Sequence, residues 1–569
     1  MSSPKFPEPP PSMPETSREV IDRKLNRLKE NASTWVDMDI DARIDILKRT
    51  IETMKRAAPK WVESVCNAKG IDPESQQAGE AWLSGPATTI RNIRLFIDTL
   101  EANGQPRPPK TWKRSNGQYV AKVFPSTIWD RIMFGGHEAE IWIQNGKPPT
   151  QGKIYRDKTY GVAKEGAVSL VLGAGNISSI GPMDALHKLV VEDEVVLLKT
   201  NPVNAYVGPF LEEGFAPLVQ AGFFEVVHGG AEVGKYLCSH PDVASIHITG
   251  SDATHDAIVW GGTKKEQNRR KKANDPKLKI PITSELGCVT PVMVVPGPFS
   301  DFEMTYHARH VASMISHNGS FNCNAAKVLV TAKGWPQEAE FLRRVRAEIC
   351  RTPPRKAYYP GAQKRYEGFL KAYPEAEVLG VGGEDIVPWT LIPEVKPEAG
   401  EYALTNEAFC GVLAHVSIDA KDAPDFLEAV VPFVNEKVWG TLSCSMILHS
   451  ESEKRYSDAV DKAIAGLKYG GIGINVWPGL IYGLVATTWG AHPSHTLDDI
   501  VSGIGVVHNS FLFDHPEKSV VRAPFIIRPT PPWFHDHGKL AGLGEALVEF
   551  ESDPSLTKLP KLVGNALLG

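Results

Sequence analysis

The sequence predicts an α/β protein with a Rossmann-like parallel sheet, a second α/β unit and a small antiparallel β element. From residue 166 onward, short apolar runs alternate with amphipathic helical stretches, and this rhythm requires right-handed crossovers between parallel strands. The same rhythm resumes at residue 282 after an interruption, which indicates the second unit. Between residues 117 and 160, runs with period-two alternation are separated by Gly and Pro, a pattern typical of antiparallel strands.

Length and composition restrict the class of protein. A chain of 569 residues is longer than one hydrophobic core usually serves, so we expect two or three domains. The net charge of −5 argues against a nucleic-acid-binding protein, because phosphate binding requires a basic surplus. Uncharged apolar runs stay shorter than the ~18 residues that a membrane span needs, so no transmembrane segment is expected.

The N-terminus and the cysteines indicate the compartment. Residues 1–15 are rich in proline and lack the basic and apolar regions of a signal peptide, so we expect a disordered tail. The seven cysteines are scattered and contain no Cys-x-x-Cys pair. This pattern favours reduced thiols and a cytoplasmic protein, and it predicts neither a disulfide framework nor a metal site.

In chain order, the N-terminal part is predicted to be helical. Apolar residues recur at three- and four-residue steps between residues 16 and 103, and residues 104–114 form a proline-containing linker. The antiparallel element follows, with runs at 118–124, 139–143 and 154–156. In the first α/β unit the expected strands are 168–172, 194–199, 223–227 and 243–249, and the expected helices are 182–191, 207–222 and 231–239.

The stretch 260–279 interrupts the alternation with a run of basic residues. We expect a solvated surface loop here, and a patch for an anionic ligand or partner is the alternative. Beyond residue 520 the chain is rich in proline and ends in the apolar stretch 556–568. In the second α/β unit the expected strands are 291–295, 327–330, 411–416, 443–448 and 473–477, and the expected helices are 302–316, 337–350 and 453–468.

Cys323 is the candidate nucleophile. It lies in the stretch 317–326, among small and amide residues directly before an apolar run. A thiolate near neutral pH needs a pKa below its usual ~8.5, and an Asn/Gly/Ser loop that enters a strand can supply backbone N–H groups that lower it. The alternative is a buried structural cysteine, as unpaired cysteines usually are.

Asn176 and Glu285 are two further candidates. Asn176 follows the strand 168–172 in a Gly-x-Gly-x-x run, at the strand end where α/β sheets bind ligands. The run departs from the dinucleotide fingerprint, because Ser178 takes its third small position and Lys199 stands where that fingerprint requires a carboxylate. Glu285 lies at the boundary between the two α/β units, where a carboxylate can act as a general base on water. A solvated loop glutamate is the alternative.

Several individually weak motifs occur in one order along the chain. They are Asn176, Lys199, Ile248-Thr249-Gly250-Ser251, Glu285-Leu286-Gly287, Asn318 to Cys323, Glu407-Ala408-Phe409 and Gly473-Ile474-Asn475. Their order and spacing resemble the aldehyde dehydrogenase superfamily over about residues 20–510. The resemblance implies a tail (1–15), a cofactor-binding domain (16–116 and 161–283), a catalytic domain (284–500), an oligomerisation element (117–160 and 501–519) and a C-terminal extension (520–569).

The resemblance implies NAD(P)-dependent oxidation of an aldehyde to a carboxylic acid. Cys323 resembles the nucleophile that adds to the carbonyl to give a thiohemiacetal, which becomes a thioester when hydride passes to the nicotinamide. Asn176, through its side-chain amide, and the backbone N–H of Cys323 resemble an oxyanion hole. Glu285 resembles the base that activates water to release the acid.

A cofactor site is also implied. NAD or NADP is expected, with NAD favoured, together with a small-molecule aldehyde as substrate and no metal. The family further implies a homodimer or homotetramer. The residues that resemble cofactor contacts are Lys199 and Glu407 at the two riboses, Phe409 near the nicotinamide, and Thr249, Gly250 and Ser251 at the helix start near the pyrophosphate.

The sequence departs from the family pattern at several of these motifs. Lys199 is followed by Thr200-Asn201-Pro202 rather than by Pro-Ser-Glu. The carboxylate that selects NAD at the adenosine ribose is therefore missing, and NADP becomes possible. The other departures are Ala174-Gly175 before the asparagine, Ser320-Phe321 before the cysteine and Cys410-Gly411 after the phenylalanine.

Two alternative functions stay open. The first is a CoA-acylating dehydrogenase, which needs no water-activating carboxylate, so the presence of Glu285 favours hydrolysis instead. The basic residues at 264–272 favour CoA, because its phosphates need cations. A catalytically silent binding protein is the other, and the presence of Cys323, Glu285 and Asn176 argues against it. The apolar stripe at 556–567 can cap a substrate tunnel, pack on a neighbouring subunit or contact a membrane surface.

Overall fold

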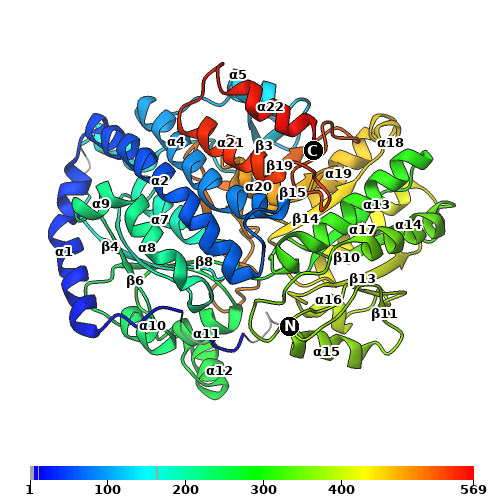
Figure 1. Ribbon diagram of the computed structural model, residues 1–569, viewed down its shortest axis with the longest axis horizontal. Coiled ribbons are helices and arrows are strands. Elements are labelled where there is room, and N and C mark those ends of the chain that lie inside the picture. The colour runs from blue at the N-terminus through cyan, green and yellow to red at the C-terminus, as the bar shows by residue number, and fades with distance from the viewer. Residues whose placement is uncertain (1–5, 10–11, 162–163) are drawn as a thin grey trace.

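Two sheets with helices on their faces make up the structure, a computed structural model that describes residues 6–9, 12–161 and 164–569. A six-stranded sheet belongs to the first α/β unit and an eleven-stranded sheet to the second. In Figure 1 the smaller sheet lies on the left, and α13, α14 and α17 cover the larger sheet on the right. This arrangement confirms the α/β fold class.

The six-stranded sheet has the order β17-β8-β7-β4-β5-β6, and only its β17 edge is antiparallel. Its central strands are continuous apolar runs because helices cover both faces. Its strands are β4 (Val168–Leu172), β5 (Val195–Lys199), β6 (Phe224–Val227), β7 (Ser245–Thr249), β8 (Ile282–Glu285) and β17 (Gly503–Ile504). The main helices around it are α1 (Arg18–Asp37), α2 (Ile40–Lys69), α4 (Thr88–Glu101), α7 (Ile180–Val190), α8 (Gly208–Gly214), α10 (Ala231–Cys238) and α11 (Asp252–Trp260).

The eleven-stranded sheet has the order β1-β2-β3-β19-β15-β14-β9-β10-β13-β12-β11. Its edge strands are β1 (Lys110–Lys113), which lies within the stretch expected to be a linker, and β11 (Glu377–Val378). Its parallel centre contains the predicted strands, and its core is the larger of the hydrophobic clusters. The parallel strands are β9 (Thr290–Val294), β10 (Ala326–Ala332), β12 (Thr390–Ile392), β13 (Val412–Ile418), β14 (Ser443–Ile447) and β15 (Gly471–Ile474). The helices that cover them include α13 (Asp301–Ser316), α14 (Glu338–Arg351), α17 (Ala423–Glu436) and α19 (Ser457–Gly466).

The antiparallel element differs from the expectation in two respects. Its first two runs are β2 (Tyr119–Phe124) and β3 (Glu138–Ile143), but the third, at 154–156, lies in the helix α6 (Lys153–Thr159). From the late part of the element, expected at 501–519, the strand that pairs with β3 is β19 (Pro516–Arg522), which runs on into the expected C-terminal extension. Because β19 also pairs in parallel with β15 of the same chain, these strands extend the second sheet rather than standing apart. An oligomerisation role for them stays a prediction.

The basic stretch forms a helix, α12 (Lys264–Ala273), so the expectation of a loop is wrong. Thr263 caps the helix by accepting a hydrogen bond from the Glu266 N–H, and Glu266 pairs with Arg270 one turn later. Lys271 pairs with Asp256 of α11 at 3.0 Å. The acidic first turn and basic last turn suit the helix dipole.

The C-terminal extension packs on the rest of the chain through α21 (Leu540–Ser552) and α22 (Leu559–Leu567). In α21, Glu551 forms ion pairs with Arg91 and Arg94 of α4. Part of the apolar stripe is buried at Leu562, whereas Leu567 is 66% exposed. In Figure 1 the two helices are the red ones at the top of the molecule, and α21 packs on α2 and α4. Within the described residues, no helix is both long and apolar enough to cross a membrane.

Candidate active site

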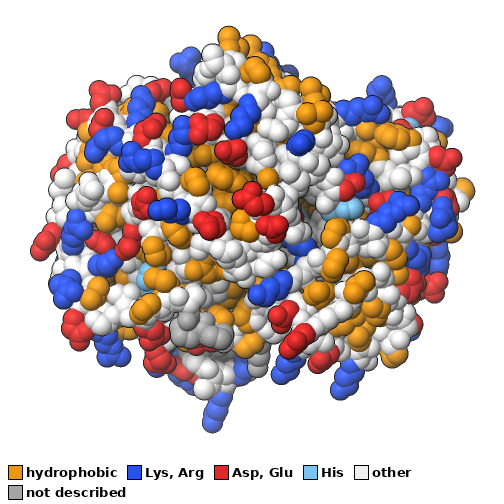
Figure 2. All heavy atoms as spheres, in the orientation of Figure 1, with side chains coloured by type: hydrophobic (Ala, Val, Ile, Leu, Met, Phe, Trp, Pro, Cys, Tyr) orange, Lys and Arg blue, Asp and Glu red, His pale blue; other side chains and the backbone are white. Residues whose placement is uncertain are grey.

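A cavity of about 990 Å³ is lined by residues from both sheets. It lies at the carboxyl ends of β4, β5 and β7, where parallel sheets bind ligands. The sequence-predicted site residues all line this one cavity: Asn176, Lys199, Thr249, Gly250, Ser251, Glu285, Cys323, Glu407 and Phe409. The space-filling view in Figure 2 shows charged side chains spread over this face of the molecule, with no single-sign field around the sheets.

The loop before Cys323 is held in an unusual backbone conformation. Asn318, Gly319 and Ser320 all have positive φ, at 54°, 65° and 70°, which costs free energy at the two positions that are not glycine. The Asn318 side chain holds the loop: its Nδ2 donates to the Phe321 carbonyl at 3.1 Å and to Asn322 Oδ1 at 3.1 Å. Strain fixed by such contacts is typical of functional loops.

Lys69 and Tyr358 extend this network toward Asn176. Lys69 Nζ donates to Asn318 Oδ1 at 2.8 Å and to the Asn176 carbonyl at 2.8 Å. The hydroxyl of Tyr358 donates to the same two oxygens, each at 3.1 Å. Burial lowers the pKa of Lys69 to about 7. The end of α2 is thus tied both to the cysteine loop and to the turn after β4.

Lys327 supports the cysteine loop from behind. Its Nζ donates to the carbonyls of Asn322 and Cys323, both at 2.9 Å, and forms a buried ion pair with Glu407 Oε1 at 3.2 Å. The same Glu407 oxygen accepts a hydrogen bond from the Cys288 N–H at 3.3 Å. Burial raises the pKa of Glu407, against the opposing charge of Lys327.

Glu285 is the hydrogen-bond partner of Cys323. The thiol donates to the Glu285 carboxylate, and Trp489 Nε1 donates to Glu285 Oε2 at 2.9 Å. Burial, followed by the negative charge of Asp184, raises the pKa of Glu285 to about 8. Asp184 in turn accepts from Thr249 Oγ1 at 2.9 Å and lies 3.4 Å from His247 Nε2. Glu285 is therefore poised to exchange a proton near neutral to mildly basic pH.

The Cys323 thiol does not have the lowered pKa that the sequence predicts. Burial, and then the neighbouring Glu285 carboxylate, raise the pKa of Cys323 well above its usual value, and Lys327 opposes this only in part. The thiol is therefore neutral at rest, and a base rather than the loop donors must take its proton. Cys323 is partly exposed toward the cavity, so the alternative of an inert core cysteine does not hold for its position.

Asn176 lies beside the cysteine loop, as the oxyanion prediction requires. Its Nδ2 donates to the Phe321 carbonyl at 2.9 Å, which uses one of the two amide hydrogens. This bond fixes the amide next to the loop that carries Cys323. Its role as an oxyanion donor stays a prediction.

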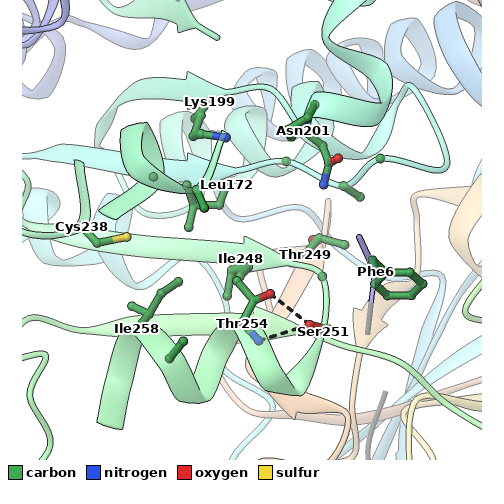
Figure 3. A pocket seen from close by; sticks show the side chains of 18 of the residues that line it. Phe6, Leu172, Lys199, Asn201, Cys238, Ile248, Thr249, Ser251, Thr254 and Ile258 are labelled. Carbon is green, nitrogen blue, oxygen red and sulfur yellow. Dashed lines mark hydrogen bonds between the residues drawn. The ribbon is translucent and has the colours of Figure 1, made fainter. Parts of the chain in front are cut away.

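The other end of the cavity is drawn in Figure 3, where Lys199, Cys238, Ile248 and Ile258 surround the space between β5, β7 and α11. Ser251 caps α11 by accepting a hydrogen bond from the Thr254 N–H. Burial lowers the pKa of Lys199 to about 8. This end combines apolar walls, a cation and a helix N-terminus, a set that suits a phosphate-containing ligand.

Phe409 closes the cavity on the side of the second unit. Its backbone has φ of +42°, and its ring packs against Tyr359 at a centroid distance of 5.0 Å and against Phe6 at 5.2 Å. Phe6 belongs to the tail that the sequence predicts to be disordered. Residues 6–9 line the cavity, so that expectation is wrong for them, and residues 1–5 and 10–11 lie outside the described part.

Sequence reasoning missed several residues of the site. Trp489 and Asp184 act on the pKa of Glu285 after burial, and they carry no local signal, because Trp489 lies in a short buried strand, β16 (Thr488–Gly490), and Asp184 in the buried helix α7. Lys327 begins the strand predicted at 327–330, but its ion pair is with Glu407, 80 positions further along the chain (407 − 327). For Lys69, the one available signal is a lysine in the last buried turn of a long helix.

Part of the chain is similar to a known protein family. Residues 189–354 match the model described as the aldehyde dehydrogenase family, a stretch that includes Lys199, Glu285 and Cys323. Human 4-trimethylaminobutyraldehyde dehydrogenase is 34% identical over 138 residues, which is 24% of this chain and 24% of the human protein. The chain thus spans about a quarter of the length of this curated relative.

Solved structures share the fold. The NADP-dependent glyceraldehyde-3-phosphate dehydrogenase of Bacillus halodurans C-125, complexed with NADP, has a TM-score of 0.57 and 16% identity over 90% of this chain and 92% of its own. A Mycobacterium tuberculosis aldehyde dehydrogenase complexed with NAD+ has a TM-score of 0.56 and 14% identity over 91% and 92%. The chain is thus similar to the aldehyde dehydrogenase family over residues 189–354, and it shares its fold with solved aldehyde dehydrogenases of low sequence identity.

Proposed function

We propose that the protein oxidises an aldehyde to the carboxylic acid with reduction of NAD or NADP. The observation that carries this proposal is the hydrogen bond between the Cys323 thiol and a buried Glu285 whose pKa is about 8, in a cavity shared with Asn176. A nucleophile beside a base of matched pKa is the arrangement that covalent catalysis requires.

In the first step Glu285 accepts the thiol proton, and the Cys323 sulfur adds to the aldehyde carbon. The carbonyl π electrons move to oxygen, and the resulting thiohemiacetal carries a negative oxygen. The Asn176 amide and the Cys323 backbone N–H stabilise that oxygen, and one such donor contributes roughly 3–4 kcal/mol to lowering the barrier. The hydrogen bonds around Asn318 hold the Cys323 sulfur and these two donors at fixed positions relative to one another.

The second half of the reaction releases the acid. A nicotinamide held by the residues assigned below would supply the hydride acceptor for this oxidation, which converts the thiohemiacetal into a thioester on Cys323. Glu285 first releases the thiol proton to solvent and then takes a proton from water, whose oxygen adds to the thioester carbon. The sulfur leaves as a thiolate and is protonated again, and the acid is released. Trp489 holds the Glu285 carboxylate during both proton transfers through its hydrogen bond to Oε2.

The residues at the cavity fit a nicotinamide dinucleotide. We assign Lys199 and Glu407 to the two riboses, Phe409 to the nicotinamide end, and Thr249, Gly250 and Ser251 to the pyrophosphate. Buried Lys199 and the capped start of α11 supply positive charge within an otherwise largely apolar wall. The fold relatives solved with NADP and with NAD+ support this assignment by analogy.

Assembly and compartment belong to the same proposal. We place the enzyme in the cytoplasm, because all seven cysteines are free, and we propose a homodimer or homotetramer on the family resemblance. Hydrolysis is preferred over transfer to CoA, because Glu285 is present and the basic residues Arg270 and Lys271 of α12 are paired with nearby carboxylates.

Replacement of the nucleophile tests the proposal. Cys323→Ala should abolish aldehyde-dependent NAD(P)H formation, because no thioester can form, and absorbance at the nicotinamide band measures it. Cys350→Ala is the matched control, since Cys350 is exposed and lies outside the cavity. Full activity of the Cys323 variant would refute the mechanism, and an acyl-CoA product formed on addition of CoA would redirect it to the acylating alternative.

A further inference from the structure

The N-terminal tail is attached along the edge of the cofactor cavity. The Thr16 N–H donates to the His228 carbonyl at 3.0 Å, and the His228 N–H donates to Thr16 Oγ1 at 2.9 Å. Glu15 Oε1 accepts a hydrogen bond from the Gly230 N–H at 2.9 Å. These contacts fasten the chain at the start of α10, beside the end of β6.

Glu8 reaches the same helix start from inside the cavity wall. Its Oε1 accepts a hydrogen bond from the Ala231 N–H at 3.0 Å. The approach is close: a Cβ on Gly230 would lie 2.0 Å from this oxygen, so the glycine is what admits the carboxylate. Glu8 lines the cavity, whereas Glu15 does not.

Phe6 packs the tail against residues of the second unit that line the cavity. Its ring packs at 5.1 Å from Tyr359 and 5.2 Å from Phe409, and the Arg365 guanidinium lies 5.0 Å from its centroid. In Figure 3 the Phe6 ring stands at the edge of the pocket, beside Thr249. The cavity of about 990 Å³ exists with this segment in place, so the tail is a wall and not a plug.

Lys199 connects the tail to the expected adenosine end. It is 7% exposed, lines the cavity, and its Nζ donates to the Thr200 carbonyl at 3.3 Å. Among the charges that favour its ammonium form, Glu8 acts most strongly. The chain after Lys199 continues as Thr200-Asn201-Pro202 and brings no carboxylate of its own to this position.

We propose that Glu8 supplies this carboxylate from the tail, accepts hydrogen bonds from the adenosine ribose hydroxyls, and so makes the enzyme prefer NAD over NADP. A carboxylate accepts from a vicinal diol and repels a 2′-phosphate. The inference rests on the proposed function, because it needs a dinucleotide in this cavity. Residues 6–9 thereby take part in the choice between NAD and NADP, because the segment after β5 contains no carboxylate that could do so.

Direct binding measurements test the role of Glu8 without turnover. NADH and NADPH are titrated into the full chain and followed by nicotinamide fluorescence. Glu8→Gln should weaken NADH binding about tenfold, as expected for loss of a charged hydrogen bond, and leave NADPH binding unchanged or stronger. Glu15→Gln is the matched control, because it caps the same helix from outside the cavity, and it should keep the wild-type preference.

Other outcomes overturn the inference in distinguishable ways. An unchanged NADH to NADPH affinity ratio in Glu8→Gln, with both nucleotides still bound, refutes the inference and leaves the proposed function standing. An equal effect of Glu15→Gln would assign the change to attachment of the tail and overturn the role of Glu8. Tighter NADH binding after deletion of residues 1–9 would make the tail a competitor of the cofactor. If neither nucleotide binds the wild-type chain, the proposed function falls too.

Discussion

Glu285 and Cys323 affect each other's pKa in opposite directions: the carboxylate raises the pKa of the thiol, and the hydrogen bond from the thiol lowers that of the carboxyl. The carboxylate disfavours the thiolate, and burial disfavours both charges. The pair therefore titrates as a unit rather than as two independent groups. Trp489 favours ionisation of Glu285, because its Nε1 donates a hydrogen bond to the carboxylate and so lowers the pKa of Glu285.

The pH dependence of the reaction follows from this pair. Glu285 is a base only when ionised, so kcat/KM should rise with pH and level off above about 8, the pKa of its carboxyl. Trp489→Phe removes a donor that lowers this pKa, so the rising limb should move to higher pH. Rate profiles between about pH 6 and 10 measure the shift.

Trp477→Phe is the matched control for the pH profile. Trp477 donates to the Asn324 carbonyl at 3.0 Å, on the cysteine loop, and not to Glu285. Trp477→Phe should change the rate but leave unchanged the pH at which kcat/KM rises. If kcat/KM of Trp489→Phe rises at the same pH as that of the wild type, Trp489 does not lower the pKa of Glu285.

Among the helices, α21 is held against α4 by a buried cluster of ion pairs. Glu551 is 1% exposed and pairs with Arg91 at 2.7 Å, while Arg91 also pairs with Asp130 at 3.2 Å. Burial opposes the charge of Glu551, but Arg91 and Arg94 outweigh it and hold its pKa below the usual value. The extension is therefore part of the folded core and not an appendage.

Glu551→Ala should destabilise the protein by about 3–5 kcal/mol, because it removes one of the two carboxylates that pair with the buried Arg91 and leaves that guanidinium with Asp130 alone. Since the folded-state pKa is lowered, the stabilisation is complete above the unfolded pKa of about 4.3 and is lost as pH falls through the folded value. Urea midpoints at neutral and acidic pH measure both effects. Glu545→Ala, on the exposed face of the same helix, is the control and should leave the midpoint unchanged.

The elements also indicate what can be predicted from the sequence. Strands such as β5 are predictable because burial on both faces makes them continuous apolar runs. The helix α12 was missed because it has one buried residue and hence no apolar periodicity, and Thr263 with Glu266 was the available signal. The link from Lys69 to Asn318 spans 249 positions, so only tertiary packing creates it.

The site follows the same rule. Cys323, Glu285 and Asn176 were found because the ordered motifs mark them, and all of them line the cavity. The sign of the thiol pKa shift was wrong, because it depends on how deeply the loop is buried and on the orientation of Glu285, neither of which spacing encodes. The contact of Phe6 with Phe409 joins residues 403 positions apart (409 − 6), and no periodicity of the sequence records it.

For the molecule as a whole, the cavity joins the two sheets. Lys199 and Ser251 come from the first unit, and Glu407 and Phe409 come from the second. Each sheet has its own large hydrophobic cluster, so a ligand held by both units adds contacts across their boundary. Binding should therefore stabilise the whole chain and not one unit alone.

Saturating NAD should raise the melting temperature. At about 100 times Kd the linkage contribution is about 2.7 kcal/mol, which for a chain of this size corresponds to about 2 °C. Differential scanning fluorimetry measures the shift. Cys323→Ala should keep it, because the nucleophile is not among the residues assigned to the cofactor, and an unchanged melting temperature in both proteins would contradict binding between the sheets.

Because residues 6–9 form part of the cavity wall, the position of an affinity tag affects measurements of cofactor binding. Phe6 is the sixth residue and packs on Phe409, so an affinity tag fused before Met1 begins within a few residues of the cavity. Cofactor affinities measured on such a fusion would include the tag. The helix α22, which ends at Leu567, lies at the top of Figure 1, far from α10 and α11 at the bottom, so a tag placed after Gly569 keeps the cofactor edge in its natural form.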